Sequence, residues 1–291
     1  MKKGIMKLIS FCLIFSITFP SNASAKECNS IRSIQEEYEI SEYDMIVSVK
    51  AGTYQEQDSH RLSEDDIQFI KSGGVEKELL RRASLSEEEL KHKFFYSDEA
   101  ISFLKTYTGT PVEESPELRA ILATLNATLT KNFCISDAAS VNYAWEWSTF
   151  PIIMVNDDIV SVAWDATYTT GNNNMQLIVN TSYSTVWYYY TDTTYQAYNF
   201  AVQSADLYHC AYTKFPMSNA FGNARKGLFR VTMGLVNTQN GSNLYQMIAH
   251  GEYRHVFPPI AVSISFSLPL SISYTGLGNT YGERNITMYA S

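Results

Sequence analysis

Histidine, cysteine and carboxylate side chains are the groups in this sequence most suited to catalysis or metal binding. His250, Glu252 and His255 lie close together. In a strand, His250 and Glu252 share a face while His255 points to the other, so the three do not converge as zinc ligands do. His209 precedes Cys210, but adjacent strand residues face opposite ways, which argues against a thiol–imidazole pair. We therefore predict no metal site.

Sequence signatures of known catalytic centres are also absent. The chain contains no G-x-S-x-G, P-loop, H-E-x-x-H or C-x-x-C pattern. We predict no catalytic residues, no cofactor and no enzymatic activity. A hydrolase that depends on His250 or Glu252 stays open as an alternative.

Aromatic side chains are the strongest candidates for ligand contact. The chain has 20 Tyr, 15 Phe and 4 Trp in 291 residues, and all four Trp lie in the second half. Aromatic rings bury large areas and anchor interfaces, and they stack on the faces of sugars. We predict a binding surface formed by Trp145, Trp147, Trp164, Trp187, Tyr188, Tyr189 and Tyr190. Residues 188–190 alternate between the faces of a strand, so at least one ring should be exposed.

Residues 260–274 show the most regular alternation in the chain, with apolar residues separated by small, mostly hydroxyl-bearing ones. Such a ribbon suits a membrane-inserting hairpin, in which a spanning strand needs about 9–11 residues. It suits a half-buried strand of a secreted sandwich equally well. Pro269 favours an edge position or a bend between two shorter strands. We favour the sandwich strand, and we keep an antimicrobial or pore-forming protein as the alternative.

The elements that position these residues divide the chain into two parts. Val141, Tyr143, Trp145 and Trp147 alternate with less apolar residues, which predicts a strand. Asn240-Gly241 predicts a hairpin between strands at 227–236 and 244–255. Short strands with regularly spaced turn residues predict an antiparallel, all-β sandwich domain over residues 136–291.

The preceding region, residues 26–135, is predicted to be helical. Serine followed by acidic residues predicts helix starts at Ser63, Ser86 and Ser97, and Ser86 with Glu89 forms a capping box. Ser115-Pro116 predicts a fourth helix, with its apolar stripe at Leu118, Ile121, Leu122, Leu125 and Leu129. The expected fold class is therefore α+β.

Charge separates the same two parts. The chain has 30 Asp+Glu and 22 Lys+Arg, a net charge of −8. Residues 26–140 carry 22 acidic and 13 basic side chains, whereas residues 141–291 carry 8 and 6. The helical region is thus acidic, and the balance argues against nucleic-acid binding, which needs a basic surface.

The N-terminus has the pattern of a signal peptide. Lys2, Lys3 and Lys7 precede an apolar run over residues 8–19 and the small residues Ala23-Ser24-Ala25. The run is too short to span a bilayer. We predict a signal peptide at residues 1–25 and a secreted, extracellular protein.

The mature chain keeps Cys28, Cys134 and Cys210, so at most one internal disulfide can form. We favour a Cys134–Cys210 disulfide and keep three unpaired thiols as the alternative. No later segment is long and apolar enough to suggest a transmembrane helix.

Several segments carry a resemblance to known sequences. They are ELLRRASLSEEEL at 78–90, YSDE at 96–99, GTP at 109–111, SPELRA at 115–120, YAWEW at 143–147 and DIVSVAW at 158–164. With these segments the chain resembles a group of uncharacterised secreted proteins of Gram-positive, clostridia-like bacteria. The resemblance covers about residues 60–165. It implies an extracellular location and a helical region followed by an aromatic β-domain, and it implies no active-site residues.

We therefore expect a secreted, non-enzymatic binding protein that presents an aromatic sheet surface to a cell-surface glycan or a protein. Contact with a membrane is expected only if the chain is a pore-forming protein. The sequence leaves the ligand and the oligomeric state open.

Overall fold

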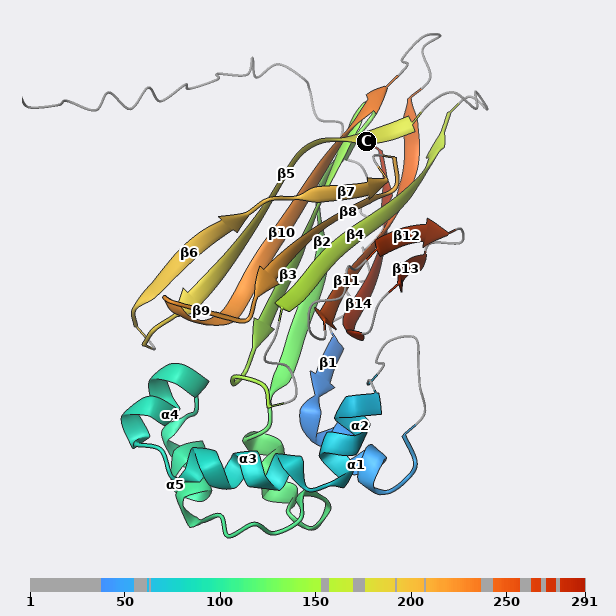
Figure 1. The fold of residues 1–291 in the computed structure, drawn as a ribbon. Coiled ribbons are helices and arrows are strands. Elements are labelled where there is room, and N and C mark those ends of the chain that lie inside the picture. The colour runs from blue at the N-terminus through green and yellow to red at the C-terminus, as the bar shows by residue number, and fades with distance from the viewer. Residues whose placement is uncertain are drawn as a thin grey trace, which may run out of the picture. The chain divides into compact units, whose positions relative to one another are not determined.

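The computed structural model describes the backbone of residues 38–54, 62, 64–152, 157–169, 176–191, 193–206, 208–236, 243–256, 263–267, 271–275 and 278–290. Side chains are described for the same residues except 38–40, 205, 206, 255, 256, 263–267, 271–275 and 278–285. The predicted signal peptide at 1–25 and Cys28 lie outside the described residues. The described helices and strands belong to one compact unit (Figure 1).

The first sheet has the strand order β1-β2-β3-β10-β5-β6, with β9 paired to β10. Its strands are β1 (Tyr38–Ser41), β2 (Thr124–Ile135), β3 (Ala138–Trp147), β5 (Gln176–Tyr189), β6 (Tyr195–Phe200), β9 (Ser218–Asn219) and β10 (Gly222–Val236). In β3, every second residue from Val141 to Trp147 is buried, while the residues between them are at most partly buried. The predicted alternation is confirmed, and its apolar face points inward.

The second sheet has the strand order β14-β11-β4-β8-β7. Its strands are β4 (Asp157–Tyr168), β7 (Gln203–Asp206), β8 (Cys210–Pro216), β11 (Leu244–Val256) and β14 (Gly278–Tyr289), and β12 (Ser263–Ser267) pairs separately with β13 (Ser271–Thr275). Every strand pair in the described part of the chain is antiparallel.

The two sheets meet through aromatic side chains. The Trp145 ring of the first sheet stacks on Phe215 of the second, with centroids 5.2 Å apart and an interplanar angle of 8°. The Trp147 indole N–H donates a hydrogen bond to the Tyr253 hydroxyl at 3.1 Å, and that hydroxyl donates to the Asp158 carboxylate. A shared apolar core between two antiparallel sheets is a sandwich-like arrangement.

Helices occupy the segment between β1 and β2, which confirms the α+β class (Figure 1). They are α1 (Glu42–Lys50), α2 (Glu64–Lys71), α3 (Gly74–Ala83), α4 (Glu87–Phe94) and α5 (Asp98–Thr106), followed by the short 3-10 helices η1 (Val112–Glu114) and η2 (Pro116–Ala120). The predicted starts at Ser86 and Ser97 are confirmed, because each hydroxyl accepts a hydrogen bond from the backbone N–H three residues later. Ser86 and Glu89 also complete the predicted capping box.

The predicted helix over 115–129 is wrong. Pro116 begins a 3-10 helix that ends at Ala120, and Thr124 begins strand β2. Leu125 and Leu129 are four residues apart, a spacing that fits a helical stripe and one face of a strand equally. Pairing with β1 on one side and β3 on the other stabilises the strand. The strand-rich part of the chain therefore begins before residue 136.

Two buried charged side chains connect the helices to the segment that follows β3. The Glu42 carboxylate of α1 accepts hydrogen bonds from the backbone N–H groups of Ala123 (3.0 Å) and Ile152 (2.9 Å). The Arg82 guanidinium of α3 donates to the carbonyl oxygens of Phe150 and Pro151, each at 2.8 Å. These contacts hold the helices against the ends of β2 and β3.

The predicted hairpin at Asn240-Gly241 is also wrong, although both residues lie outside the described part. The flanking strands, β10 and β11, belong to different sheets. An Asn-Gly pair favours a tight turn locally, but the partner of each strand is set by burial of its two faces. This connection therefore crosses from one sheet to the other.

Cys134 and Cys210 form no disulfide with each other. Cys134 packs in the core between the sheets, where burial raises the pKa of its thiol. Ala211 also belongs to that core, so its neighbour Cys210 lies on the opposite, outer face of the second sheet. The favoured disulfide is thus wrong because the second sheet separates the two thiols.

The 260–274 ribbon consists of two short strands instead of one long strand. β12 and β13 pair antiparallel, with Ile264 opposite Tyr274 and Phe266 opposite Ile272. This agrees with the interruption predicted from Pro269. The side chains that would make the ribbon amphipathic lie outside the described residues. No helix in the described ranges is both long and apolar enough to cross a membrane.

Candidate functional site

The aromatic residues predicted for ligand contact divide into buried and surface positions. The side chains of Trp147, Trp164 and Tyr188 are buried, with at most 1% of their surface exposed. A side chain with no accessible surface contacts no ligand, so these three residues belong to the core. Trp145 is 3% exposed, whereas Tyr190 is 66% exposed. The expected exposed ring among residues 188–190 is therefore Tyr190.

Trp187 and Tyr189 lie on the outer face of the first sheet. Trp187 alternates along β5 with buried Val186 and Tyr188, so its side chain points away from the core. Tyr189, the last residue of β5, is only 8% exposed. Both border a groove of about 550 Å³ on that face. We refer to it as the aromatic groove. It is lined by Asn126, Thr128, Ala144, Trp145, Glu146, Trp187, Tyr189, Tyr195, Lys226, Gly227 and Leu228.

Strand register aligns the polar and aromatic residues of the aromatic groove in a row. Asn126 of β2 is opposite Glu146 of β3, Glu146 is opposite Lys226 of β10, and Lys226 is opposite Trp187 of β5. Neighbouring strands are about 4.8 Å apart, so the row from Asn126 to Trp187 extends about 14 Å across the sheet. Its length suits a short oligosaccharide better than a single sugar.

Two small residues, Ala144 and Gly227, lie in the floor of the aromatic groove. Gly227 has no side chain, and a Cβ at this position would lie 2.5 Å from the Trp145 indole. Trp145 therefore packs from the core side directly beneath the floor. Ala144 is the next small lining residue, on β3. Ala144 leaves the outer face without a bulky side chain at this point, whereas the missing side chain of Gly227 leaves room for the Trp145 indole on the core side.

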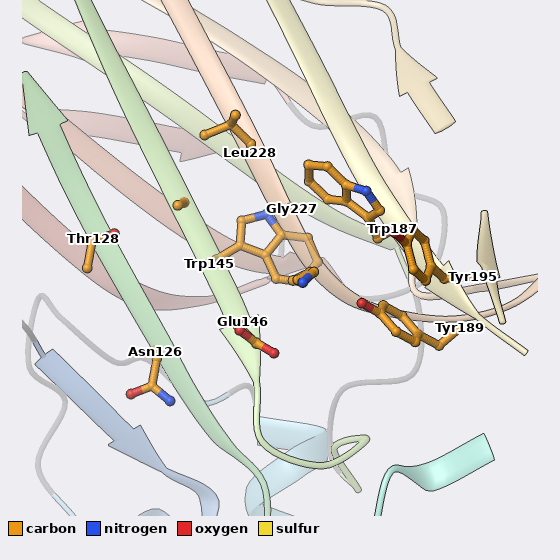
Figure 2. Close-up of a pocket in the computed structure, with 11 residues that line it drawn as sticks. Asn126, Thr128, Trp145, Glu146, Trp187, Tyr189, Tyr195, Gly227 and Leu228 are labelled. Carbon is orange, nitrogen blue, oxygen red and sulfur yellow. The ribbon is translucent and has the colours of Figure 1, made fainter. Parts of the chain in front are cut away.

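Three aromatic rings form one wall (Figure 2). The rings of Tyr189 and Tyr195 lie 5.2 Å apart with an interplanar angle of 32°. Tyr195 is 56% exposed, and Trp187 is partly buried. Figure 2 shows Asn126 and Thr128 on the opposite side of the groove, with Glu146 between them and the rings. The site thus combines ring faces on one side with hydrogen-bonding groups on the other.

Phe95, which follows helix α4, and Arg225 of β10 pack against the Tyr189 ring of the aromatic wall. The Phe95 ring packs edge-on against Tyr189 with centroids 5.9 Å apart. The Arg225 guanidinium lies over both rings, 5.3 Å from the Phe95 centroid and 5.6 Å from that of Tyr189. Arg225 occupies the register shift between Ala224 and Lys226, and this irregularity places its side chain beside the groove.

Positively charged side chains outnumber carboxylates among the described residues in and beside the aromatic groove. Arg225 Nε lies 3.6 Å from Glu146 Oε1, beyond normal hydrogen-bond length, and within the described residues that buried Nε makes no hydrogen bond. Lys226 forms no ion pair or hydrogen bond with any described residue. Two cationic side chains thus accompany one carboxylate.

Several residues of the site were not anticipated from the sequence. They are Asn126, Thr128, Tyr195, Lys226 and Gly227. A partial signal existed in β3, where the polar alternation Asn142, Ala144, Glu146 marks the outer face. The contribution of β10 depends on pairing between distant segments, which the sequence pattern alone does not show.

The other predicted positions lie elsewhere. Trp164 donates its indole N–H to the Leu177 carbonyl at 3.3 Å and lines a small cavity of about 160 Å³ together with Asp165 and His209. His250 and Glu252 are buried on the second sheet, with Nε2 and Oε2 3.9 Å apart. Among the described residues, no group of three or more His, Cys, Asp or Glu could hold a metal ion.

Comparisons with known proteins identify no family. No family model matches the chain, and no curated protein matches it. One solved structure with partial likeness is AvmM, described as catalysing macrocyclization in alchivemycin A biosynthesis. It has a TM-score of 0.23 and 6% identity over 54% of this chain and 89% of that chain.

Another concerns the pH-modulated adhesion of Streptococcus parasanguinis by Fap1 fimbriae. Its TM-score is 0.19, with 9% identity over 58% of this chain and 81% of that chain. Likeness at this level carries no functional conclusion.

Proposed function

We propose that this protein is a secreted, non-enzymatic binding protein and that its aromatic groove binds a cell-surface glycan. The proposal depends chiefly on the wall of Trp187, Tyr189 and Tyr195 facing polar groups across a hollow floor. Apolar faces of sugar rings pack on aromatic side chains, while their hydroxyl groups need hydrogen-bond partners. The site offers both kinds of contact.

The single carboxylate among the described residues that line the aromatic groove supports a binding role over hydrolysis. Hydrolysis of a glycosidic bond ordinarily uses two carboxyl groups on either side of that bond. Glu146 is the one acidic residue among those that line the groove. We therefore propose that the bound glycan is released unchanged.

The remaining parts of the proposal come from the sequence. The signal-peptide pattern at 1–25 supports export, and the resemblance to secreted Gram-positive proteins agrees with it. We propose that the acidic helical region supports the groove through the contact of Phe95 with Tyr189. The antimicrobial or pore-forming alternative depends on the 260–274 ribbon, and dye release from liposomes tests it.

Substitution of Trp187 tests the proposed function. The mature protein is screened on a glycan array, and affinities for bound glycans are measured by isothermal titration calorimetry. Because an anchoring aromatic residue contributes about 2 kcal/mol, Trp187→Ala should lower the affinity about 30-fold. The Tyr245→Ala control removes an exposed ring (55%) from the second sheet, outside the aromatic groove, and should leave the affinity unchanged.

Two results would contradict the proposal. One is an array on which the wild-type protein binds no glycan. The other is equal affinity of wild-type and Trp187→Ala proteins. Mass spectrometry of the glycan after incubation checks the non-enzymatic part, because a shortened product would show hydrolysis.

A further inference from the structure

The outer face of the first sheet carries two matching pairs of a cation and an aromatic ring. Lys226 of β10 is opposite Trp187 of β5, and Arg230 of β10 is opposite Tyr183 of β5. The Arg230 guanidinium lies over the Tyr183 ring at 5.2 Å from its centroid. Tyr183 is 40% exposed. Each pair presents a positive charge beside a ring.

The two pairs are separated by a regular distance along the strands. Lys226 and Arg230 are four residues apart on β10, as are Trp187 and Tyr183 on β5. At about 3.4 Å per residue, the separation is about 14 Å. Leu228 of β10 and Thr185 of β5 lie opposite each other between the pairs. The surface therefore repeats one chemical pattern along the strand direction.

The described side chains around these pairs include three cations (Arg225, Lys226 and Arg230) and the carboxylate of Glu146, although the whole chain has a net charge of −8. Glu146 is the carboxylate among the described residues that line the aromatic groove, and its Oε1 lies 3.6 Å from Arg225 Nε. Arg230 donates from Nε to the neutral Asn142 amide oxygen at 2.6 Å. Neither Lys226 nor Arg230 forms an ion pair with a described residue. Two cationic groups thus stay available to an anion.

We propose that the aromatic groove and its extension along β5 and β10 bind an acidic oligosaccharide. Two of its anionic groups contact Lys226 and Arg230, and its rings pack on Trp187 and Tyr183. The inference rests on the proposed glycan-binding function. It adds the charge of the ligand, its direction along β5 and β10, and its minimum length. The shared ligand chemistry is an anionic group on a sugar ring, supplied by a carboxylate or by a sulfate.

Single-stranded nucleic acid also combines rings with negative charge. Proteins that bind it use a basic groove that follows the backbone, and phosphate contacts commonly number about 6–10 in nucleic-acid complexes. Two available cations on this face are fewer than a groove that follows a phosphate backbone provides, so we favour an acidic glycan. A single-stranded oligonucleotide is nevertheless included in the test.

Matched ligands separate charge from ring stacking. The mature protein is titrated with galacturonate oligosaccharides of increasing length, with their carboxyl-reduced neutral counterparts, and with sulfated dextran oligosaccharides. We expect the galacturonate or the sulfated series to bind more tightly than the neutral one. Affinity should rise with length until the ligand covers both cation–ring pairs, and should fall as salt increases.

Variants assign the effect to the two pairs. Lys226→Gln and Arg230→Gln should each lower affinity for the acidic ligand about tenfold, the loss expected of one charge-assisted hydrogen bond. The loss of affinity for the neutral counterpart should be smaller, because no charge-assisted bond is lost there. Lys77→Gln on α3 removes the same charge from an exposed site remote from this face and should change neither affinity.

The outcomes distinguish this inference from the proposed function. If neutral and acidic ligands bind equally and Trp187→Ala still lowers both, the acidic-ligand inference fails and the glycan-binding function stands. If an oligonucleotide binds more tightly than every acidic glycan, the glycan assignment fails. If no oligosaccharide binds, both proposals fail.

Discussion

Gly227 is the residue at which the core and the aromatic groove come closest together. Replacing it with alanine places a methyl group 2.5 Å from the Trp145 indole. Because the indole is itself packed on Phe215, relief requires a shift in the core. We expect Gly227→Ala to lower the free energy of unfolding by about 1–3 kcal/mol, measured by urea denaturation.

The matched control for this prediction lies on the same strand. At Gly234 the nearest atom to an added Cβ is 3.7 Å away, on the Asn180 side chain, which is an ordinary contact distance. Gly234→Ala should therefore leave stability nearly unchanged. Equal stability of the Gly227→Ala and wild-type proteins would show that Trp145 does not prevent a side chain at position 227.

At the scale of single elements, capping determines where α4 begins. Ser86 Oγ accepts a hydrogen bond from the Glu89 backbone N–H at 3.1 Å. The Glu89 carboxylate in turn accepts one from the Ser86 backbone N–H at 3.3 Å. Ser86→Ala should cost about 1 kcal/mol of unfolding free energy. Ser84→Ala, two residues earlier, removes a hydroxyl that binds only a carbonyl and should cost less. Comparable losses in thermal melts would contradict the capping argument.

Helix α3 carries a carboxylate that makes stability depend on pH. Burial by itself raises the pKa of Glu78, but hydrogen bonds and charges from Arg81 and Arg82 outweigh it and lower the pKa below 4.5. A carboxyl group with a lowered folded-state pKa stabilises fully above its unfolded pKa, and this contribution is lost as pH falls through the folded value. Glu78→Gln should therefore lose about 1–2 kcal/mol near neutral pH.

The same argument fixes the pH profile of that loss. The difference in unfolding free energy between wild-type and Glu78→Gln proteins should be constant above about pH 5 and should shrink below pH 4.5. Glu87→Gln removes an exposed acid of α4 as the control. A difference that persists unchanged at acid pH would argue against the ionised Glu78 as its source.

At the scale of the whole molecule, Arg82 joins the helices to the sheets. It is 1% exposed and donates to two backbone carbonyl groups after β3 and to the Tyr96 hydroxyl. Arg82→Met should lower the free energy of unfolding by about 3–5 kcal/mol, because buried polar partners lose their cation. The neighbouring Arg81, which bonds with Glu78 and whose side chain is 54% exposed, is the control.

Arg81→Met should cost less than about 1 kcal/mol, as an exposed ion pair does. Both variants are compared by urea denaturation, and similar losses would contradict a joining role for Arg82. Because Phe95 contacts Tyr189, we also expect Arg82→Met to weaken glycan binding under conditions where the protein remains folded.

Local patterns in the sequence predicted much of the secondary structure. The helix starts at Ser86 and Ser97 follow from capping chemistry, which depends on neighbouring residues alone. The β3 alternation was likewise readable, since successive side chains of a strand face opposite ways. The segment 115–129 failed because its leucine spacing fits two periods and only pairing with β1 and β3 decides between them.

The proposed binding surface follows from the sequence less completely than the secondary-structure elements do. The sequence identifies candidate binding residues by their aromatic type, and type does not distinguish a ring that points into the core from one that points to the solvent. Trp147 and Trp164 are buried away from the aromatic groove, whereas Trp187 and the 8% exposed Tyr189 border it. Lys226 and Gly227 join them through pairing of β10 with β3 and β5, between segments distant in the chain.

The sequence by itself determined the α+β class, the antiparallel strands and the capped helices, because these depend on periodicity and local hydrogen bonding. Tertiary structure alone decided which rings face the solvent and which cations lie beside them. Strand order brings β3, β10 and β5 together, and the absence of a side chain at Gly227 leaves room for the Trp145 indole directly beneath their outer face. The His250 and Glu252 pair is buried on the second sheet, while the polar residues of the aromatic groove lie on the first.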